Sequence, residues 1–375
     1  MGFEPEGDGA IMLNGVYAVV MAGGKGERFW PQSRISRPKQ FLQLLGDATM
    51  IEMTVERLRQ LLPVENILVV TNREYVDGVR VLMPFLPEEN VIGEPAARDT
   101  APCAALAAGI IRARGGDEAV MILLPADHMI ERTHDLASLL EDVALRAQKN
   151  SEWIYTVGVV PTEPATGYGY IRCGEMLEPA GETKLFRSLG FREKPDLATA
   201  RAFLEEGSYR WNCGMFLFQV RALEAEMARQ CPELATMLRQ VSDLEQSGTL
   251  AGTLPSLFGR QQKRSIDYAV MEHALKMAVA ECRFDWDDIG SWTALRNHLT
   301  ADRNGNVATG LFAELDSHNL IVSGQPNHLV AAIGVNDLVI VTTPDATLVC
   351  HANQAQRIKE LLATFGLRPE LRPFL

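Results

Sequence analysis

The sequence predicts an α/β fold in which a mostly parallel sheet is covered by helices on both faces, followed by a small β-rich domain. Over the first half of the 375-residue chain, short apolar runs alternate with helical patterns. This order is typical of parallel strands joined by helices. After about residue 300 the chain changes to short alternating pieces rich in Val, Ile, Asn, Asp and Gly. We therefore expect a domain boundary near residue 300.

The predicted elements follow one another in a regular order. Strands are predicted over residues 17–21, 67–71, 120–124 and 153–160, and then near residues 168–172, 185–191 and 215–219. Helices are predicted over residues 51–62, 100–114, 135–149, 265–277 and 352–365. Thr49 and Glu52 have the spacing of a capping box in front of the first helix. Because ligands bind at the carboxyl ends of the strands in such sheets, the loops after the strands are the places to look for function.

Composition limits the partners and the compartment. The net charge of −12 argues against a nucleic-acid partner, which needs a basic face. The apolar runs are far shorter than the ~20 residues that cross a bilayer, so we expect no membrane contact. Residues 1–15 lack the basic start of a signal peptide, and we expect a flexible extension over residues 1–14. The six cysteines form no C-x-x-C pair, which favours a cytoplasmic location without a zinc or redox site.

The most informative segment is the loop after the first strand, MAGGKGER (residues 21–28). Its glycines let backbone N–H groups approach phosphates closely. The loop is not a Walker loop, because G-x-x-x-x-G-K-[ST] is absent. It also fails as a dinucleotide fingerprint, because Phe29 replaces the third glycine and Asp47 lies in a turn before a helix. For the glycines alone, a plain strand-to-helix turn stays open.

The continuation of this loop supplies fixed positive charge. Pro31 and Pro38 stiffen the segment, and Arg28, Arg37 and Lys39 add cations. A bound triphosphate needs close backbone approach followed by cations held in place. We expect Arg28 and Lys39 to act on phosphates and Arg37 to be solvated.

Further segments share one pattern with this loop. They are GGKGERFWPQSR (23–34), PKQF (38–41), EPAARDTAP (94–102), LPADH (124–128), GYGYI (167–171), FREKP (191–195), WNCGMF (211–216), SIDYAVME (265–272) and WDDIGSW (286–292). Together they closely resemble the signature of the mannose-1-phosphate guanylyltransferases (GDP-mannose pyrophosphorylases), a family of sugar-phosphate nucleotidyltransferases. The resemblance runs from about residue 16 to the end. It departs at Phe29, Asp99 and Cys213, where the family more often has Leu, Asn and Ser.

The resemblance implies a Rossmann-like nucleotidyltransferase fold over residues 15–300. For residues 301–375 it implies a domain with a short left-handed β-helix, which packs on the catalytic domain or forms a homodimer contact. The implied reaction transfers GMP from GTP to α-D-mannose 1-phosphate and releases pyrophosphate, with Mg²⁺ or another divalent cation such as Mn²⁺. Two alternatives stay open. In the first, the chain is another sugar-1-phosphate nucleotidyltransferase that uses glucose 1-phosphate or a different NTP. In the second, it is a non-catalytic regulatory subunit that senses sugar nucleotides.

The resemblance also assigns nucleotide-binding residues. They are Ala22, Gly23, Gly24, Lys25, Gly26, Glu94, Thr100 and Asp127. For Glu94 there is a separate chemical reason, because the guanine edge presents two adjacent N–H donors that match one carboxylate. A structural acid in front of Pro95 is the rival interpretation.

The metal is expected on two aspartates. Asp127 and Asp288 each lie in a turn, and Mg²⁺ prefers one or two carboxylates together with phosphate oxygens and water. Turn capping is the commoner task of a loop aspartate, but the resemblance assigns both residues to the metal.

The sugar-phosphate side is expected in the later loops. The resemblance assigns sugar contact to Glu193 and phosphate contact to Lys194, and Pro195 favours an extended conformation at Lys194. Asn212 is read as a partner of a sugar hydroxyl, with a plain turn as the alternative. Gly167 is expected to offer its backbone amide.

Three cations are expected to carry the catalysis. Arg28 is expected to neutralise the departing pyrophosphate. Lys39 and Lys194 are expected to hold the α-phosphate and the sugar phosphate together. The nucleophile is already an anion, so no general base is needed.

Overall fold

A computed structural model describes residues 12–375. The predicted flexible extension over residues 1–14 lies outside the described residues, apart from residues 12–14. The described chain forms two compact units that do not follow the order of the chain. Unit 1 contains the residues up to Gly23, Thr54–Ala126 and Ile130–Trp286, and unit 2 contains Gly24–Met53, Asp127–Met129 and Asp287–Leu375. The division into residues 15–300 and 301–375 stays a prediction.

Unit 1 is built on one nine-stranded sheet with the strand order β3-β2-β1-β4-β8-β5-β9-β7-β6. Its strands are β1 Val16–Ala22, β2 Ile67–Asn72, β3 Val91–Glu94, β4 Val120–Pro125, β5 Ile154–Val159, β6 Gly169–Ala180, β7 Thr183–Arg192, β8 Tyr209–Gln219 and β9 Met277–Glu281. Strands β1 to β4 pair in parallel, as do β5 and β9. Strand β8 enters antiparallel between β4 and β5, and β6 and β7 form an antiparallel pair.

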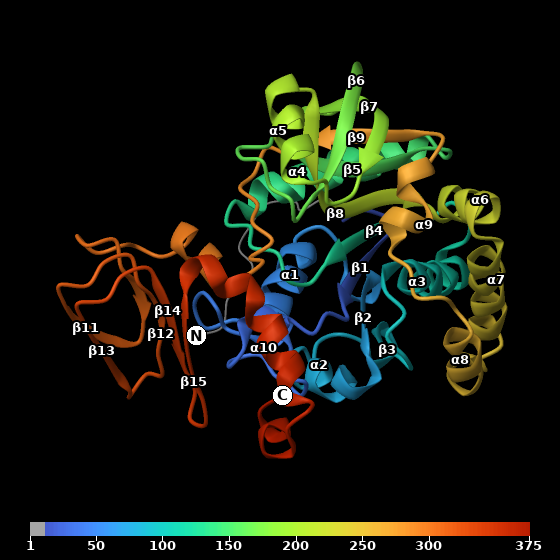
Figure 1. Cartoon of the computed structure of the whole chain (residues 1–375). Helices are drawn as coiled ribbons and strands as arrows, with labels where there is room; N and C mark the ends of the chain where they lie inside the picture. The colour runs from blue at the N-terminus through green and yellow to red at the C-terminus, as the bar shows by residue number, and fades with distance from the viewer. Residues whose placement is uncertain (1–11) are drawn as a thin grey trace. The chain divides into compact units, whose positions relative to one another are not determined.

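Helices cover both faces of this sheet, as the sequence predicts. The helices of unit 1 are α2 Val76–Leu82, α3 Thr100–Gly115, α4 Thr133–Lys149, α5 Leu197–Glu206, α6 Val220–Gln230, α7 Pro232–Gln246, α8 Leu250–Gly259 and α9 Ile266–Ala269. Helices α3 and α7 pack together and share one apolar cluster with alternate residues of the central strands, such as Val19 and Met121 (Figure 1). Helix α4 contacts β4, β5 and β8 but lies outside that cluster, so it covers the opposite face.

Helix α1 (Met50–Arg59) begins with the predicted capping box. The Thr49 hydroxyl accepts from the Glu52 backbone N–H at 3.3 Å, and the Glu52 carboxylate accepts from the Thr49 backbone N–H at 2.8 Å. Two helical N–H groups that would otherwise lack partners are thereby satisfied. The prediction of this helix start is confirmed.

The helix predicted over residues 265–277 is mostly wrong. Ser265 does cap a helix, but α9 ends at Ala269, and a 3₁₀ turn follows over Met271–His273. Strand β9 then begins at Met277. The Ile154 backbone N–H donates to the Lys276 carbonyl, and Met277 pairs with Ile154. Tertiary pairing in the sheet therefore overrides the helical propensity of the segment.

Unit 2 contains the predicted β-rich domain. Its strands are β10 Val307–Thr309, β11 Leu311–Leu315, β12 Ile321–Ser323, β13 Leu329–Ile333, β14 Leu338–Thr342 and β15 Thr347–His351. Strands β10, β12 and β14 pair in parallel, and so do β11 and β13, so successive coils of chain stack on one another. The predicted final helix is a 3₁₀ turn over Ala352–Arg357 followed by α10 (Ile358–Phe365).

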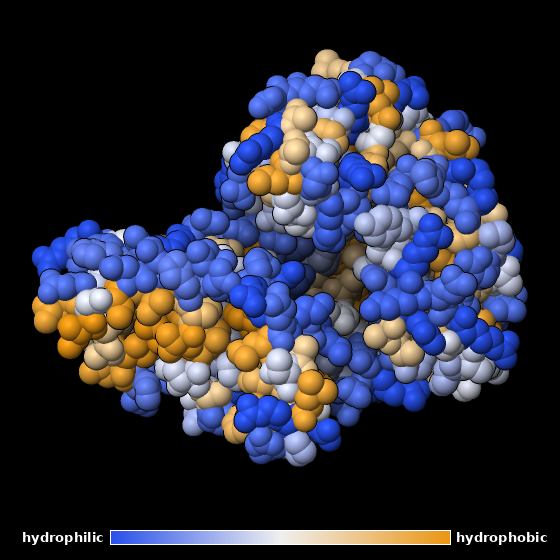
Figure 2. Space-filling view, in the orientation of Figure 1, coloured by the Kyte–Doolittle hydropathy of each residue, from blue (hydrophilic) through white to orange (hydrophobic). Residues whose placement is uncertain are grey.

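The outer face of β11 and β13 is apolar and exposed. The outward residues pair across the two strands as Leu311 with Leu329, Ala313 with Ala331, and Leu315 with Ile333. Figure 2 shows apolar side chains gathered over this part of the domain. A stable dimer interface takes roughly 20–30 residues from each partner, so these six cover only part of one. The homodimer stays a prediction.

Candidate functional site

The signature loop is shaped around a glycine and a lysine. Gly26 has φ +61°, a left-handed conformation that disfavours side chains, and it precedes the 3₁₀ turn Glu27–Phe29. A Cβ on Gly26 would collide with the Cβ of Lys39 and lie 2.8 Å from its backbone nitrogen. Lys25 and Arg28 are exposed in this loop. Gly26 therefore makes room for Lys39, while the two exposed cations face solvent.

Lys39 connects the two predicted metal aspartates within unit 2. Its ammonium donates to Asp127 Oδ2 and to the Asp127 carbonyl, both at 2.9 Å, and to the Asp288 carbonyl at 2.6 Å. The Lys39 side chain is only 7% exposed. An ammonium has three N–H donors, so these contacts use all of them. The structure thus brings Lys39, Asp127 and Asp288 together from three distant parts of the sequence.

Both aspartate turns are held by hydrogen bonds. The Met129 and Asp287 backbones bond to each other at 2.8 and 3.1 Å, which joins the two turns. Desolvation opposes ionisation of Asp127, but the Lys39 ammonium, His128 and a backbone hydrogen bond together outweigh it and hold the pKa of Asp127 below its ordinary value. Asp287 accepts from His298 at 3.1 Å and from the Ile289 N–H at 2.7 Å. Asp287 therefore shapes the turn that presents its neighbour Asp288.

The donor set of this cluster fits a divalent cation that is completed by its substrate. Asp127 and Asp288 supply two carboxylates, and the Asp127 side chain is 37% exposed and so open to a ligand. Mg²⁺ takes one or two protein carboxylates and fills its remaining positions with phosphate oxygens and water. Within residues 12–375, no group of three or more His, Cys, Asp or Glu could hold a metal by itself. The cluster therefore suits a shared substrate metal better than a permanent structural one.

Glu94 ends strand β3 in unit 1 and is 7% exposed. Its Oε1 is buried without a hydrogen-bond partner among the described residues. Its Oε2 lies 3.5 Å from where a Cβ on Gly23 would stand, at the end of β1. Burial raises the pKa of Glu94 to about 7, against a smaller lowering by the Cys103 thiol. A buried acceptor without a partner is costly, and the other oxygen of the same carboxylate lies beside the first glycine of the signature.

The remaining predicted nucleotide residues of unit 1 flank Glu94. Ala22 is buried, and its carbonyl accepts from the Thr71 hydroxyl at 2.8 Å. Thr100 begins α3, and its hydroxyl accepts from the Ile266 N–H at 2.8 Å. Asp99 caps the helix with φ +68°. These contacts fix the backbone around the ends of β1 and β3.

Glu193 and Lys194 follow strand β7 and form an ion pair of 2.7 Å. The Glu193 carboxylate lies directly against Gly169, where any side chain would collide with it. The expectation of an extended Lys194 is wrong, because its φ is +44°. The Lys194 N–H donates to the Tyr168 carbonyl at 3.2 Å, and this tertiary contact overrides the preference set by Pro195. A non-glycine residue in this conformation is strained by about 1–3 kcal/mol.

Asn212 lies on β8 and contacts a residue that sequence reasoning missed. Its Nδ2 donates to Asp267 Oδ1 at 2.9 Å. Desolvation, followed by the nearby Glu193 carboxylate, raises the pKa of Asp267 to about 6. The only sequence signal for Asp267 was its place in the SIDYAVME segment. Glu193, Lys194, Asn212 and Asp267 thus form one polar cluster in unit 1.

Aromatic rings line this part of unit 1. The Tyr168 ring centroid lies 5.0 Å from that of Trp211 and 5.2 Å from that of Trp286. Gly167, next to Tyr168, is exposed, so its backbone amide is open to a ligand. Flat apolar surfaces beside a few polar groups are typical of small-molecule sites.

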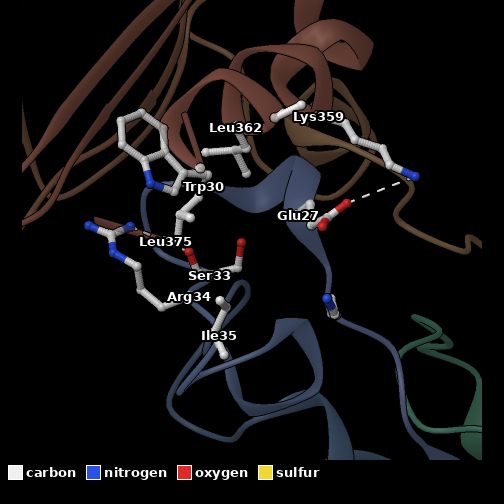
Figure 3. A pocket seen from close by; sticks show the side chains of 11 residues that line it. Glu27, Trp30, Ser33, Arg34, Ile35, Lys359, Leu362 and Leu375 are labelled. Carbon is white, nitrogen blue, oxygen red and sulfur yellow. Dashed lines mark hydrogen bonds and ion pairs between the residues drawn. The ribbon is translucent and has the colours of Figure 1, made fainter. Parts of the chain in front are cut away.

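A separate cavity of about 280 Å³ lies in unit 2 between the signature loop and α10. Figure 3 shows Glu27, Trp30 and Ser33 on one side and Lys359 and Leu362 on the other. Glu27 and Lys359 form an ion pair of 3.9 Å across its mouth. Among the predicted site residues only Lys25 lines this cavity, so it is distinct from the Lys39 cluster.

Comparisons with known proteins agree with the motifs. Residues 17–305 match the family model described as Nucleotidyl transferase, and residues 311–364 match one described as MannoseP isomerase/GMP-like beta-helix domain. A mannose-1-phosphate guanylyltransferase of Klebsiella pneumoniae is 37% identical over 350 residues, covering 91% of this chain and 72% of that protein. The alginate biosynthesis protein AlgA of Pseudomonas aeruginosa is 35% identical over 348 residues, covering 92% and 71%.

A solved structure agrees as well. It comes from Thermus thermophilus, is described as a mannose-1-phosphate geranyltransferase, and shares 33% identity with a TM-score of 0.83 over 94% of this chain and 99% of that chain. None of the described helices is long and apolar enough to span a membrane. The predicted β-rich domain is confirmed as a β-helix domain, while its left-handedness stays a prediction. Since one family model covers more than half of the sequence, and relatives match most of it at over 30% identity, the chain belongs to the nucleotidyl transferase family.

Proposed function

We propose that this nucleotidyltransferase transfers GMP from GTP to α-D-mannose 1-phosphate and releases pyrophosphate, giving GDP-mannose. The observation that carries the proposal is the set of Lys39 contacts to the Asp127 carboxylate and to the backbone carbonyls of Asp127 and Asp288, because these contacts bring together two aspartates that suit a divalent cation. A catalytically dead regulatory subunit has no need to retain this arrangement together with Arg28. The names of the relatives support guanine and mannose as the substrates.

The chemistry is a single in-line displacement. A phosphate oxygen of the sugar 1-phosphate attacks the α-phosphorus of GTP, and the bond from that phosphorus to the bridging oxygen of pyrophosphate breaks. Asp127 and Asp288 would hold a divalent cation, which would supply charge neutralisation at the phosphates. Arg28, which is exposed on the signature loop, binds the negative charge that develops on pyrophosphate. The attacking oxygen is already anionic, so no protein group has to remove a proton.

The structure changes the role that we propose for Lys39. All three of its N–H donors are used by Asp127 and Asp288, so none is left for the α-phosphate that the sequence analysis assigned to it. We propose that Lys39 acts by holding the Asp127 carboxylate and the backbone of the Asp288 turn in place. Lys194, whose side chain is 61% exposed, is then the cation that binds the sugar phosphate.

Recognition of the two substrates falls to unit 1. Glu94 offers its unpartnered Oε1 and the second carboxylate oxygen to the two N–H donors of guanine. Glu193 accepts hydrogen bonds from sugar hydroxyls, and Asn212 contacts the sugar beside it. The preference for mannose over glucose and the cytoplasmic location remain predictions.

The test measures pyrophosphate release with four NTPs and several sugar 1-phosphates, with and without Mg²⁺. We expect GTP with mannose 1-phosphate to be the preferred pair and the rate to vanish without a divalent cation. Preference for another pair would retain a sugar-phosphate nucleotidyltransferase with different substrates. No sugar nucleotide from any pair would refute the proposal.

A further inference from the structure

We propose that Asp267 is a positioning residue of the sugar-phosphate side, where its carboxylate holds the Asn212 amide, near the Glu193–Lys194 ion pair, in the arrangement that binds a neutral hexose 1-phosphate. The inference rests on the proposed function, because it assigns a new role within the same reaction. It follows from three features of unit 1: the hydrogen bonds of Asn212, the charges around Lys194 and the attachment of Asp267 to helix α3.

The Asn212 side chain has a fixed orientation. Its Oδ1 accepts from the Gly214 backbone N–H at 3.1 Å and from the Thr156 hydroxyl at 3.2 Å. Its Nδ2 donates to Asp267 at 2.9 Å. Because a carboxylate only accepts, the contact with Asp267 determines which end of the amide is nitrogen. Both lone pairs of Oδ1 are then used, and Asn212 offers a sugar its second N–H.

Asp267 also contributes to the charge balance around Lys194. Desolvation lowers the pKa of Lys194, but Glu193 and then Asp267 outweigh it and raise the pKa above its ordinary value. Lys194 therefore stays charged, paired with Glu193 and under the electrostatic influence of Asp267, before any phosphate arrives. Hydroxyl donors of a neutral sugar satisfy these carboxylates, whereas the carboxylate of a uronic acid would be repelled. The cluster therefore favours neutral hexose 1-phosphates over uronic acid 1-phosphates.

The position of Asp267 is set by the start of α3. The Ile266 N–H donates to the Thr100 hydroxyl at 2.8 Å, and the Ala101 N–H donates to the Arg264 carbonyl at 3.1 Å. Ser265 caps the short helix α9 by accepting from the Tyr268 N–H. Asp267 is thus attached to the segment that carries Thr100, a predicted nucleotide-binding residue. This attachment fixes its carboxylate before substrate binds.

The test compares Asp267→Ala, Asp267→Asn, Asn212→Ala and the Asp267→Ala/Asn212→Ala double variant by steady-state kinetics. Losing a hydrogen bond to a charged group should raise the KM for sugar 1-phosphate roughly 10- to 100-fold in Asp267→Ala. The KM for the NTP should stay within about twofold. Asp267→Asn keeps an oxygen for Asn212 and should show a smaller rise, together with weaker discrimination against uronic acid 1-phosphates. The double variant should be at most about threefold worse than the worse single variant, because both residues act through one contact.

The exposed Glu205 on α5 provides a matched control, and Glu205→Gln should behave as the wild type. Thermal unfolding checks that each variant is folded. The inference is overturned if Asp267→Ala leaves the KM for sugar phosphate unchanged, raises both KM values equally, or combines multiplicatively with Asn212→Ala. Any of these results with an active wild-type enzyme leaves the proposed function standing. A wild-type protein that makes no sugar nucleotide removes both.

Discussion

Substitution of Glu94 by glutamine tests base selection with a nearly isosteric change. The carboxylate is 7% exposed, and its Oε1 has no partner within the described part of the chain. Glutamine keeps the shape but replaces one acceptor oxygen by an NH₂ donor. That donor would face a donor of guanine, whereas adenine presents one acceptor and one donor and so matches an amide. The substitution should therefore weaken the use of GTP and improve the use of ATP.

The magnitude follows from the hydrogen bonds involved. Each bond to a charged group contributes roughly 1.5–3 kcal/mol, and a buried N–H left without a partner costs a further 1–3 kcal/mol. Losing one such bond and leaving one guanine N–H unsatisfied amounts to about 3–5 kcal/mol. The kcat/KM for GTP should fall roughly 10²- to 10⁴-fold.

The assay is kcat/KM for GTP and ATP in the wild type, Glu94→Gln and Glu88→Gln. Glu88 is an exposed carboxylate in the turn before β3, and its substitution should change neither value. An unchanged GTP-to-ATP ratio in Glu94→Gln would refute the assignment of base selection to this residue.

The same residue predicts a pH dependence. With a folded-state pKa of about 7 against an ordinary value of 4.5, Glu94 is protonated below pH 7 and must lose its proton to bind guanine. The wild-type kcat/KM for GTP should therefore fall about tenfold per pH unit below pH 7. Glu94→Gln is the reference, because it shares the titration of the substrate phosphates near pH 6 but lacks that of Glu94.

The same raised pKa predicts an effect on stability. Ionisation of the buried acid above pH 7 costs about 3 kcal/mol. Glu94→Gln without nucleotide should therefore be more stable than the wild type at pH 8 but not at pH 4.

The other predictions concern unit 2 and helix α1. Gly26→Ala should lower turnover at least about 100-fold, because it demands a left-handed alanine and displaces Lys39. Lys39→Met should raise the Mg²⁺ concentration for half-maximal rate about 10- to 100-fold by releasing the Asp127 carboxylate and the backbone of the Asp288 turn. Arg28→Ala should lower turnover about 10³-fold without loss of stability, since Arg28 is exposed. Thr49→Ala should cost about 1 kcal/mol in urea unfolding by removing the capping box.

Each of these has a result that contradicts it. Gly366→Ala, at an ordinary backbone conformation where a Cβ would make only a van der Waals contact of 3.8 Å, is the control for Gly26→Ala and should keep full turnover. An unchanged Mg²⁺ requirement in Lys39→Met would mean that Lys39 does not organise the carboxylates. A near-normal rate in Arg28→Ala would remove it from the mechanism. Equal stability of Thr49→Ala and the wild type would show that the capping box contributes nothing.

Local patterns in the sequence were sufficient where short-range physics decides the structure. The strand before the signature loop and the helix after Thr49 were predicted because an apolar run and a capping box are read directly from neighbouring residues. The order of strands and helices likewise indicated the α/β architecture. Helices α5 to α8 were not predicted, because α5 lies in a stretch for which only strands were predicted and no element was predicted between residues 219 and 265.

The sequence could not show which long-range contacts each site residue makes. Lys194 was expected to be extended, and only the carbonyl of Tyr168 explains its left-handed backbone. The SIDYAVME segment gave no indication of the role of Asp267, since its partner Asn212 is 55 residues away. The commitment of Lys39 to two carbonyls and a carboxylate was equally hidden. Such roles depend on tertiary geometry that spacing along the chain does not encode.

Within unit 2, the C-terminal domain packs against the signature loop. The signature loop residues Phe29 and Trp30 share one buried cluster with Trp292 and with the inner face of α10. The Trp292 indole donates to the Trp30 carbonyl at 3.1 Å, and the Trp30 ring lies edge-on to Phe365 at 5.5 Å. The loop that presents Arg28, and the turn at Gly26 that seats Lys39, therefore pack on apolar side chains from the domain after residue 300 as well as on Trp292. Because buried aromatic contacts of this kind hold a loop in place, we expect the small domain to be part of the scaffold of the proposed cation site.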